Sequence, residues 1–104
     1  MSVTGLRADP LEEVVELLQA LAAPVRLAVI TELRSGPRCV HELIDALTDS
    51  GRDVRQPLMS QHLRVLRSAG VVATERRGQE VVYRLTHSGI GELAAAAVRQ
   101  AATR

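Results

Sequence analysis

The chain has 104 residues, nearly half of them apolar, with one tyrosine, no other aromatic side chain and a formal net charge of +1. This length predicts one domain, 1–104, with an aliphatic core and no internal disulfide, because Cys39 is the only cysteine. We expect a cytoplasmic protein without a membrane span: the first ten residues lack the basic start and apolar run of a signal peptide, and Pro24 and Arg26 interrupt the longest apolar tract.

Two helices are predicted in the first third of the chain. The Asp-Pro pair at 9–10 combines an N-cap with a first-turn proline, and it opens a helix over 9–23 whose apolar residues recur every three or four positions. Pro24 opens a second helix, and the Gly-Pro pair at 36–37 ends it.

Two further helices are predicted over 40–69, joined by a polar turn. The third begins at Val40, and the polar stretch 48–56 that follows is long for a connection between helices. The fourth is "QPLMSQHLRVLRSAG", with Pro57 in its first turn and Gly70 after its end. The side chains expected on its buried face are Leu58, Leu63, Leu66 and Ala69.

A hairpin and a fifth helix complete the predicted fold. Two β-rich runs, 71–75 and 80–85, flank a tip with two arginines and a glycine, which predicts a hairpin over 71–85. The helix over 87–102 has an apolar stripe of mostly small residues. This order predicts a mainly α fold with a small β-hairpin (α+β), a winged helix-turn-helix with five helices and a two-stranded wing.

Charge is distributed unevenly along the chain. Residues 1–51 hold four arginines against eight acidic residues, whereas residues 52–84 hold seven arginines against three. All basic residues are arginine, whose planar guanidinium suits bidentate contact with phosphate and guanine. The basic part contains the fourth helix and the hairpin, so we expect their exposed faces to bind double-stranded DNA.

The sequence resembles the ArsR/SmtB family of small metal- and stress-responsive bacterial repressors over about residues 17–93. Three stretches carry the resemblance: "LLQALAAPVRLAVITEL", "QPLMSQHLRVLRSAGVV" and "RRGQEVVYRL". The resemblance implies the family's fold and its activity as a DNA-binding transcriptional regulator. It also matches exposed positions of the fourth helix to the family's recognition helix.

Two groups of side chains are predicted to bind DNA. Polar residues near the start of the fourth helix are spaced to reach base edges in a major groove, and arginines of the hairpin suit phosphate or minor-groove contact. The alternative for both groups is an ordinary solvated surface, and His62 could equally pack beside Leu66. The candidates are Gln56, Ser60, Gln61, His62, Arg64, Arg67, Arg76 and Arg77. The long turn 48–56 either contacts DNA through Arg52 and Arg55 or is loose.

The stretch "RCVHEL", residues 38–43, resembles the family's metal site at the start of the third helix, where two thiolates normally stand two residues apart. Cys39 matches the first and His41 takes the place of the second. Both residue types bind zinc or nickel, although a closed zinc site needs four donors. The alternatives are that Cys39 is a buried small side chain, that its oxidation is the signal, or that a partner regulatory protein supplies the signal.

We expect a homodimer, because apolar stripes on helices 9–23 and 87–102 would otherwise stay exposed. A winged-helix module that binds protein would need an apolar patch on the fourth helix, which is instead polar. An enzyme with Cys39 as nucleophile would need an activating base, and His41 is poorly directed for that task, so no enzymatic activity is expected. The expected interface residues are Leu11, Val15, Leu18, Ile90, Leu93 and Ala97.

Overall fold

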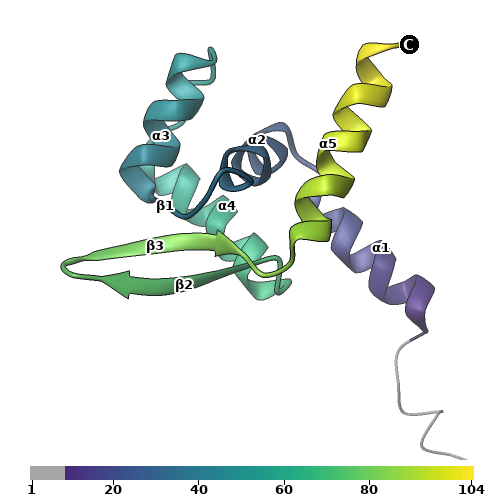
Figure 1. The fold of residues 1–104 in the computed structure, drawn as a ribbon, viewed down its shortest axis with the longest axis horizontal. Coiled ribbons are helices and arrows are strands. Elements are labelled where there is room, and N and C mark those ends of the chain that lie inside the picture. Colours follow the sequence, from purple (N-terminus) through teal and green to yellow (C-terminus); the bar gives the residue numbers. More distant parts are fainter. Residues whose placement is uncertain (1–8) are drawn as a thin grey trace, which may run out of the picture.

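The computed structural model describes residues 9–104 and has the predicted order of elements, with one additional strand (Figure 1). It confirms the mainly helical winged helix-turn-helix fold. The elements are α1 (Pro10–Leu21), α2 (Pro24–Leu33), β1 (Arg38–Cys39), α3 (Val40–Asp49), α4 (Gln56–Ser68), β2 (Val72–Arg77), β3 (Glu80–Leu85) and α5 (Ser88–Ala102).

Capping residues set the ends of the helices. The Asp9 carboxylate accepts a hydrogen bond from the amide of Leu11 at 2.7 Å, as an N-cap does. Gly51 and Gly70 follow α3 and α4 with φ of +93° and +74°, a conformation that favours glycine. At both ends, the amides of the glycine and of the residue after it donate hydrogen bonds to helix carbonyls in the Schellman pattern. This pattern ends each helix just before its glycine.

The sheet has three strands rather than the two predicted. β1 pairs antiparallel with β3, and the strand order is β1-β3-β2. With only two residues, β1 has no alternating pattern that sequence could reveal. β3 has the predicted bounds, whereas β2 begins one residue later than predicted and runs on to Arg77. The hairpin closes on the pair Arg77–Glu80, so both wing arginines lie in β2 and the turn is Gly78–Gln79.

The core is aliphatic and surrounds α2. Val29 and Ile30 are completely buried in it, and α2 contacts the four other helices and β3. α4 contributes Met59, Leu63 and Leu66, which are spaced by four and three residues and therefore share one helix face.

Two of the four residues predicted on the buried face of α4 are exposed. Leu58 lies five residues before Leu63, so it falls outside the buried stripe, and 46% of its surface is accessible. Ala69, at the end of α4, is exposed as well. Met59 takes the core position that the sequence analysis gave to Leu58.

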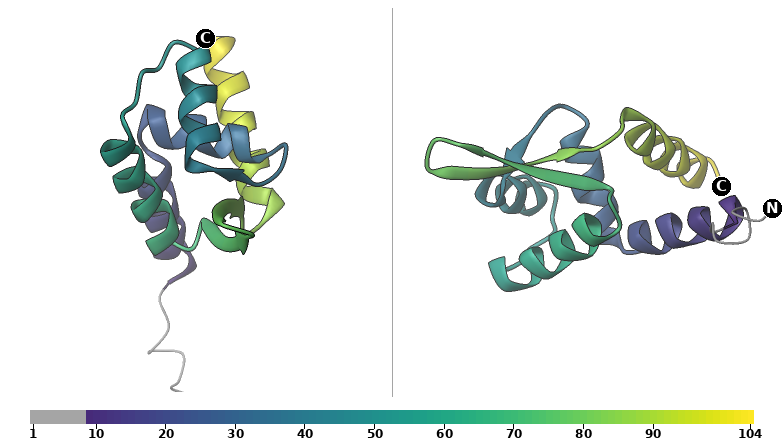
Figure 2. Two further views of the ribbon diagram at one scale, coloured as in Figure 1. Left: turned by 90° about the vertical axis from the view of Figure 1, so that its left-hand side faces the viewer. Right: turned by 90° about the horizontal axis from the view of Figure 1, so that it is seen from below.

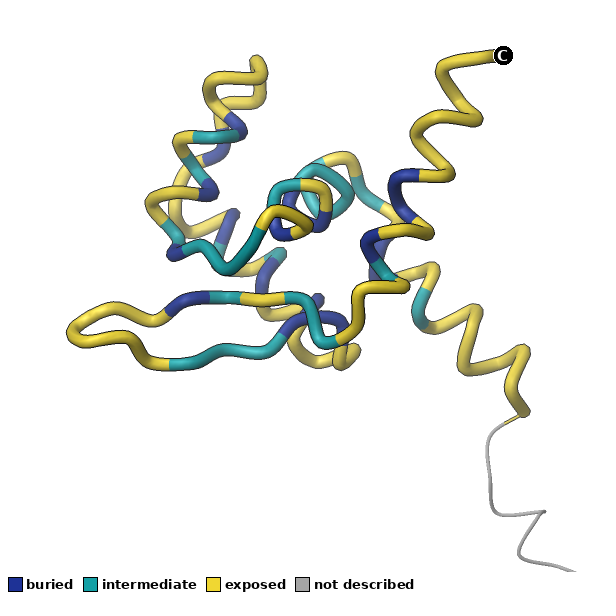
Figure 3. Tube along the Cα trace, in the orientation of Figure 1, coloured by how far each residue is buried: buried dark blue, intermediate teal, exposed yellow. Residues whose placement is uncertain are grey.

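The hairpin and the pair α1 and α5 occupy opposite ends of the molecule (Figures 1 and 2). Most of α1 and the second half of α5 are exposed in Figure 3. Within residues 9–104 no single helix is long and apolar enough to cross a membrane; α1 and α2 pass that test only as a pair, and they are bent by 96° at the break between them.

Two glycines of α5 provide a matched test of the packing. A Cβ at Gly91 would stand 2.7 Å from Cγ of Arg34 and 3.1 Å from Cδ1 of Leu85, whereas a Cβ at Gly89 would meet nothing within 4 Å. We expect Gly91→Ala to lower the free energy of unfolding by about 1–3 kcal/mol through overpacking. Gly89→Ala should raise it by about 0.5–1 kcal/mol, since alanine favours a helix. Urea unfolding measures both, and equal stabilities would contradict the close approach.

Candidate nucleic-acid interface

The exposed part of α4 is mostly polar and basic, with Leu58 and Val65 as its two exposed large apolar side chains. Gln56, Gln61, Arg64 and Arg67 are exposed, and Ser60 is half-buried. The stripe of α4 against the core fixes which side faces outward. Arg55 occupies the N-cap without a side-chain capping bond, so its guanidinium adds positive charge where the helix dipole is already positive. This end of α4 therefore suits a negatively charged polymer.

His62 is half-buried and contacts α2, a partner that the sequence analysis did not consider. Nη1 of Arg26 lies 3.0 Å from its Nδ1. Burial lowers the pKa of His62, and the positive charge of Arg26 lowers it further. The ring is therefore neutral around pH 7.

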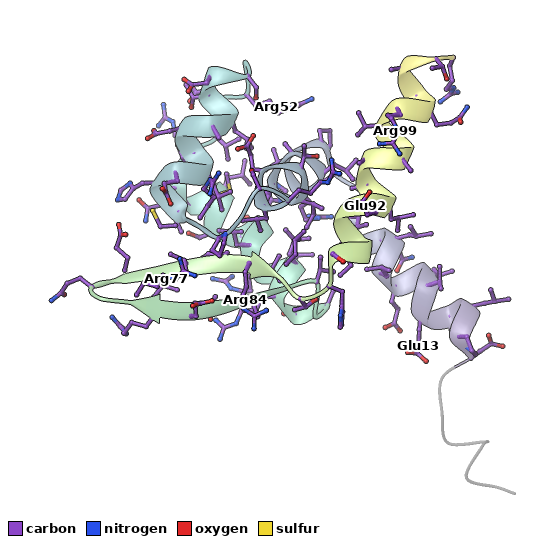
Figure 4. The ribbon with its side chains drawn as sticks, viewed as in Figure 1. Glu13, Arg52, Arg77, Arg84, Glu92 and Arg99 are labelled. Atoms are coloured by element: carbon purple, nitrogen blue, oxygen red, sulfur yellow. The ribbon has the colours of Figure 1, made fainter. Side chains whose placement is uncertain are left out.

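The arginines of the hairpin differ in whether they form an ion pair. The carboxylate of Glu75 lies 3.3 Å from Nε of Arg77 and 3.5 Å from Nε of Arg84. Figure 4 labels both of these arginines on the hairpin. Successive side chains of a strand point to opposite faces, so Arg76 lies on the other face from Glu75. Arg76 is exposed and forms no ion pair within residues 9–104. Its charge is thus the most available one on the wing.

The long connection between α3 and α4 is anchored to the core. Val54 is 4% exposed and joins the core cluster, which holds this segment in place. Arg52 lines a groove of about 470 Å³ with Pro24, Leu27 and Val98. Arg52 therefore lies beside α2 and α5, and Arg55 lies at the start of α4.

The two candidate metal ligands differ in their surroundings. Cys39 is a buried free cysteine, and its amide donates to Oε1 of Glu42 at 2.9 Å. That hydrogen bond is the main reason why the pKa of Glu42 is lowered. His41 is exposed. In the part of the chain that the structure describes, no three His, Cys, Asp or Glu side chains gather closely enough to hold a metal, so Cys39 and His41 alone do not form a closed zinc site.

The candidate dimer surface is exposed on both helices. Leu11, Val15 and Leu18 of α1 are 73%, 51% and 46% exposed, and Leu93 of α5 is 42% exposed. Ala97 is also exposed. Ile90 is partly buried against the core of its own protomer, which leaves less of it for an interface.

Sequence comparison relates the chain to bacterial regulators. Residues 23–74, half of the chain, match the family described as bacterial regulatory protein, arsR family. The chain is 54% identical over 86 residues to the HTH-type transcriptional repressor SmtB of Mycobacterium tuberculosis, a match that covers 83% of this chain and 60% of that protein. It thus spans less than two thirds of the length of this relative.

Two solved structures have the same arrangement of elements. The transcriptional repressor BigR from Xylella fastidiosa superposes with a TM-score of 0.72 at 38% identity, covering 82% of either chain. The Mycobacterium bovis protein Mb0332, described as a homodimeric winged helix-turn-helix DNA-binding domain and a possible ArsR-family regulator, gives a TM-score of 0.72 at 27% identity. That match covers 91% of this chain and 87% of the solved one.

Proposed function

Because this chain belongs to the ArsR family of bacterial regulatory proteins, we propose that it is a homodimeric transcriptional regulator that binds operator DNA through α4 and the wing. The observation that carries the proposal is the exposed polar and arginine face of α4, backed by a buried aliphatic stripe and followed by a basic hairpin. The family consists of regulators rather than enzymes.

The two surfaces have different roles in this proposal. Gln61 and Arg64 project from the recognition helix α4 and carry amide and guanidinium groups, which read adenine and guanine edges in the major groove. Arg76 in β2 and Arg55 at the N-cap of α4 are exposed charges, and they neutralise phosphates without reading sequence.

Selection from random DNA tests the proposal directly. Rounds of binding and amplification should enrich one sequence with two-fold symmetry, the operator, because a symmetric dimer presents two copies of α4. Mobility shifts should then show that the operator outcompetes random DNA by at least about a thousandfold. Enrichment of no sequence would contradict the proposed function.

Variants of α4 and the wing should have separable effects. Gln61→Ala should lower the preference for operator over random DNA by about 1–3 kcal/mol, because it removes a base contact. Arg76→Ala should weaken both complexes and reduce the salt slope by about one. Arg77→Ala is the matched control and should change the slope less, since the carboxylate of Glu75 competes with phosphate for Arg77. Equal losses on both DNAs from all three variants would contradict base readout by α4.

The proposed dimer joins α1 and α5 of two protomers. These helices lie at the end of the molecule away from the wing, so pairing there leaves both DNA-binding surfaces free (Figure 2). Pairing would remove their exposed leucines and valines from water, which stabilises the dimer by roughly 25 cal/mol for each Å² of apolar surface buried.

A charge in this surface should break the dimer. Leu93→Glu would bury a carboxylate in the apolar interface, so we expect monomers in sedimentation and weak operator binding. Ala96→Glu is the matched control and should stay a dimer. Ala96 is also exposed on α5, but it is not an expected interface residue, and the charged residues Glu92 and Arg99 each lie one turn away. A parent protein that sediments as a monomer at micromolar concentration would refute the dimer.

We propose Cys39 and His41 as the ligands of a zinc or nickel signal, on their Cys-x-His spacing and their place at the start of α3. Further donors would have to come from water or a second protomer. Cys39→Ser combined with His41→Ala should abolish any change of operator affinity with either metal, yet leave affinity in a chelator unchanged. A double variant that still responds would place the site elsewhere, and an unresponsive parent would favour a partner protein or thiol oxidation as the signal.

A further inference from the structure

One side chain connects the recognition helix with two other helices. Arg26 stands in the first turn of α2, and its Nε donates to the backbone carbonyl of Ala20 in the last turn of α1 at 2.6 Å. Its Nη1 contacts Nδ1 of His62 in α4 at 3.0 Å. α1 has no basic residue in its own last turn, so Arg26 also supplies the positive charge that favours a helix C-terminus.

The chemistry of this contact defines the state of His62. A guanidinium has only hydrogen-bond donors, so Nδ1 of His62 must be an unprotonated acceptor, and the ring proton resides on Nε2. A second proton would remove this acceptor and place two cations at hydrogen-bond distance. The contact therefore exists only while His62 is neutral.

Arg26 is the one charged side chain that shifts the pKa of His62 electrostatically within residues 9–104. α1, α2, α3 and β2 pack against α4. α1 brings Glu16, which lines a groove with Arg64 on α4, and neither of these charges contributes to the lowered pKa of His62. No charge of α3 or β2 contributes either. The proton on His62 thus acts chiefly on the contact with Arg26.

We propose that Arg26 is a positioning residue that orients α4 through His62, and that protonation of His62 releases α4 and lowers operator selectivity. Selectivity here means the affinity for operator divided by the affinity for random DNA. This inference rests on the proposed function, and it adds a residue outside the DNA-binding surface and a dependence on pH.

The direction of the effect follows from two opposite consequences of protonation. An added positive charge on α4 favours binding to any DNA, because phosphates are attracted regardless of sequence. Base readout instead requires α4 to keep its orientation, so it suffers when the contact breaks. The pKa of His62 lies below its ordinary value in the folded protein, so the contact is complete at neutral pH and is lost as pH falls through that pKa.

The experiment measures selectivity at pH 7.5 and at a pH below the pKa of His62, which NMR titration of the ring provides, with the operator selected for the parent protein. The selectivity of the parent should fall about tenfold at the lower pH, because the charge-assisted hydrogen bond between Arg26 and His62 is then lost. His62→Asn places an amide oxygen near the position of Nδ1 and does not titrate. The selectivity of this variant should therefore be the same at both pH values.

Two further variants separate positioning from general effects. Arg26→Gln should show reduced selectivity at both pH values, while its affinity for random DNA changes little. His87→Asn is the matched control, because His87 is exposed at the N-cap of α5 without a capping bond, and it should follow the pH profile of the parent. Thermal melts of each variant at both pH values test whether the variant is folded under the conditions of the binding measurement.

Two results would overturn the inference. One is a selectivity of the parent that is constant with pH, and the other is a fall in the selectivity of His62→Asn equal to that of the parent. If His87→Asn removes the pH dependence, His87 carries the effect and the inference is wrong. Failure to select any operator is a different result, because it contradicts the proposed function itself.

Discussion

The packing of α2 determines where both candidate surfaces lie. Its apolar side chains point in several directions, and Val29, Ile30 and Leu33 are buried while α1, α3, α4, α5 and β3 contact the helix. A helix that is apolar on most sides is stable only inside a shell of other elements. Because α4 and α5 meet on α2, the distance and angle between the proposed DNA-binding surface and the proposed dimer surface are set by contacts with one ten-residue helix.

Much of the fold was predictable because local chemistry specifies it. Three helices carry proline in their first turn, and α4 ends before a glycine whose positive φ other residues rarely adopt. Such signals require no knowledge of distant residues. The two-residue strand β1 lacks one, since its pairing with β3 depends on a partner more than forty residues along the chain.

The details of the site depended on contacts between distant elements. Strand alternation predicts that neighbouring residues Arg76 and Arg77 face opposite sides, but only the structure shows that Glu75 pairs with Arg77. Leu58 and Met59 are adjacent apolar residues. The helical period of 3.6 shows which of them faces the core only when the other core residues are known. The partner of His62 lies thirty-six residues away in the sequence, where no spacing rule applies.

On the proposed function, the distribution of charge implies that α4, rather than the wing, governs discrimination between operator and random DNA. Two of the three wing arginines share one carboxylate, and the whole chain has a net charge of only +1. A wing with one uncompensated arginine gains little from phosphates, so on the proposed function it contributes little affinity for random DNA. Discrimination would then rest on the base contacts of α4, which tolerate small errors of position poorly. A chain built in this way depends more on the orientation of its recognition helix than a strongly basic one does.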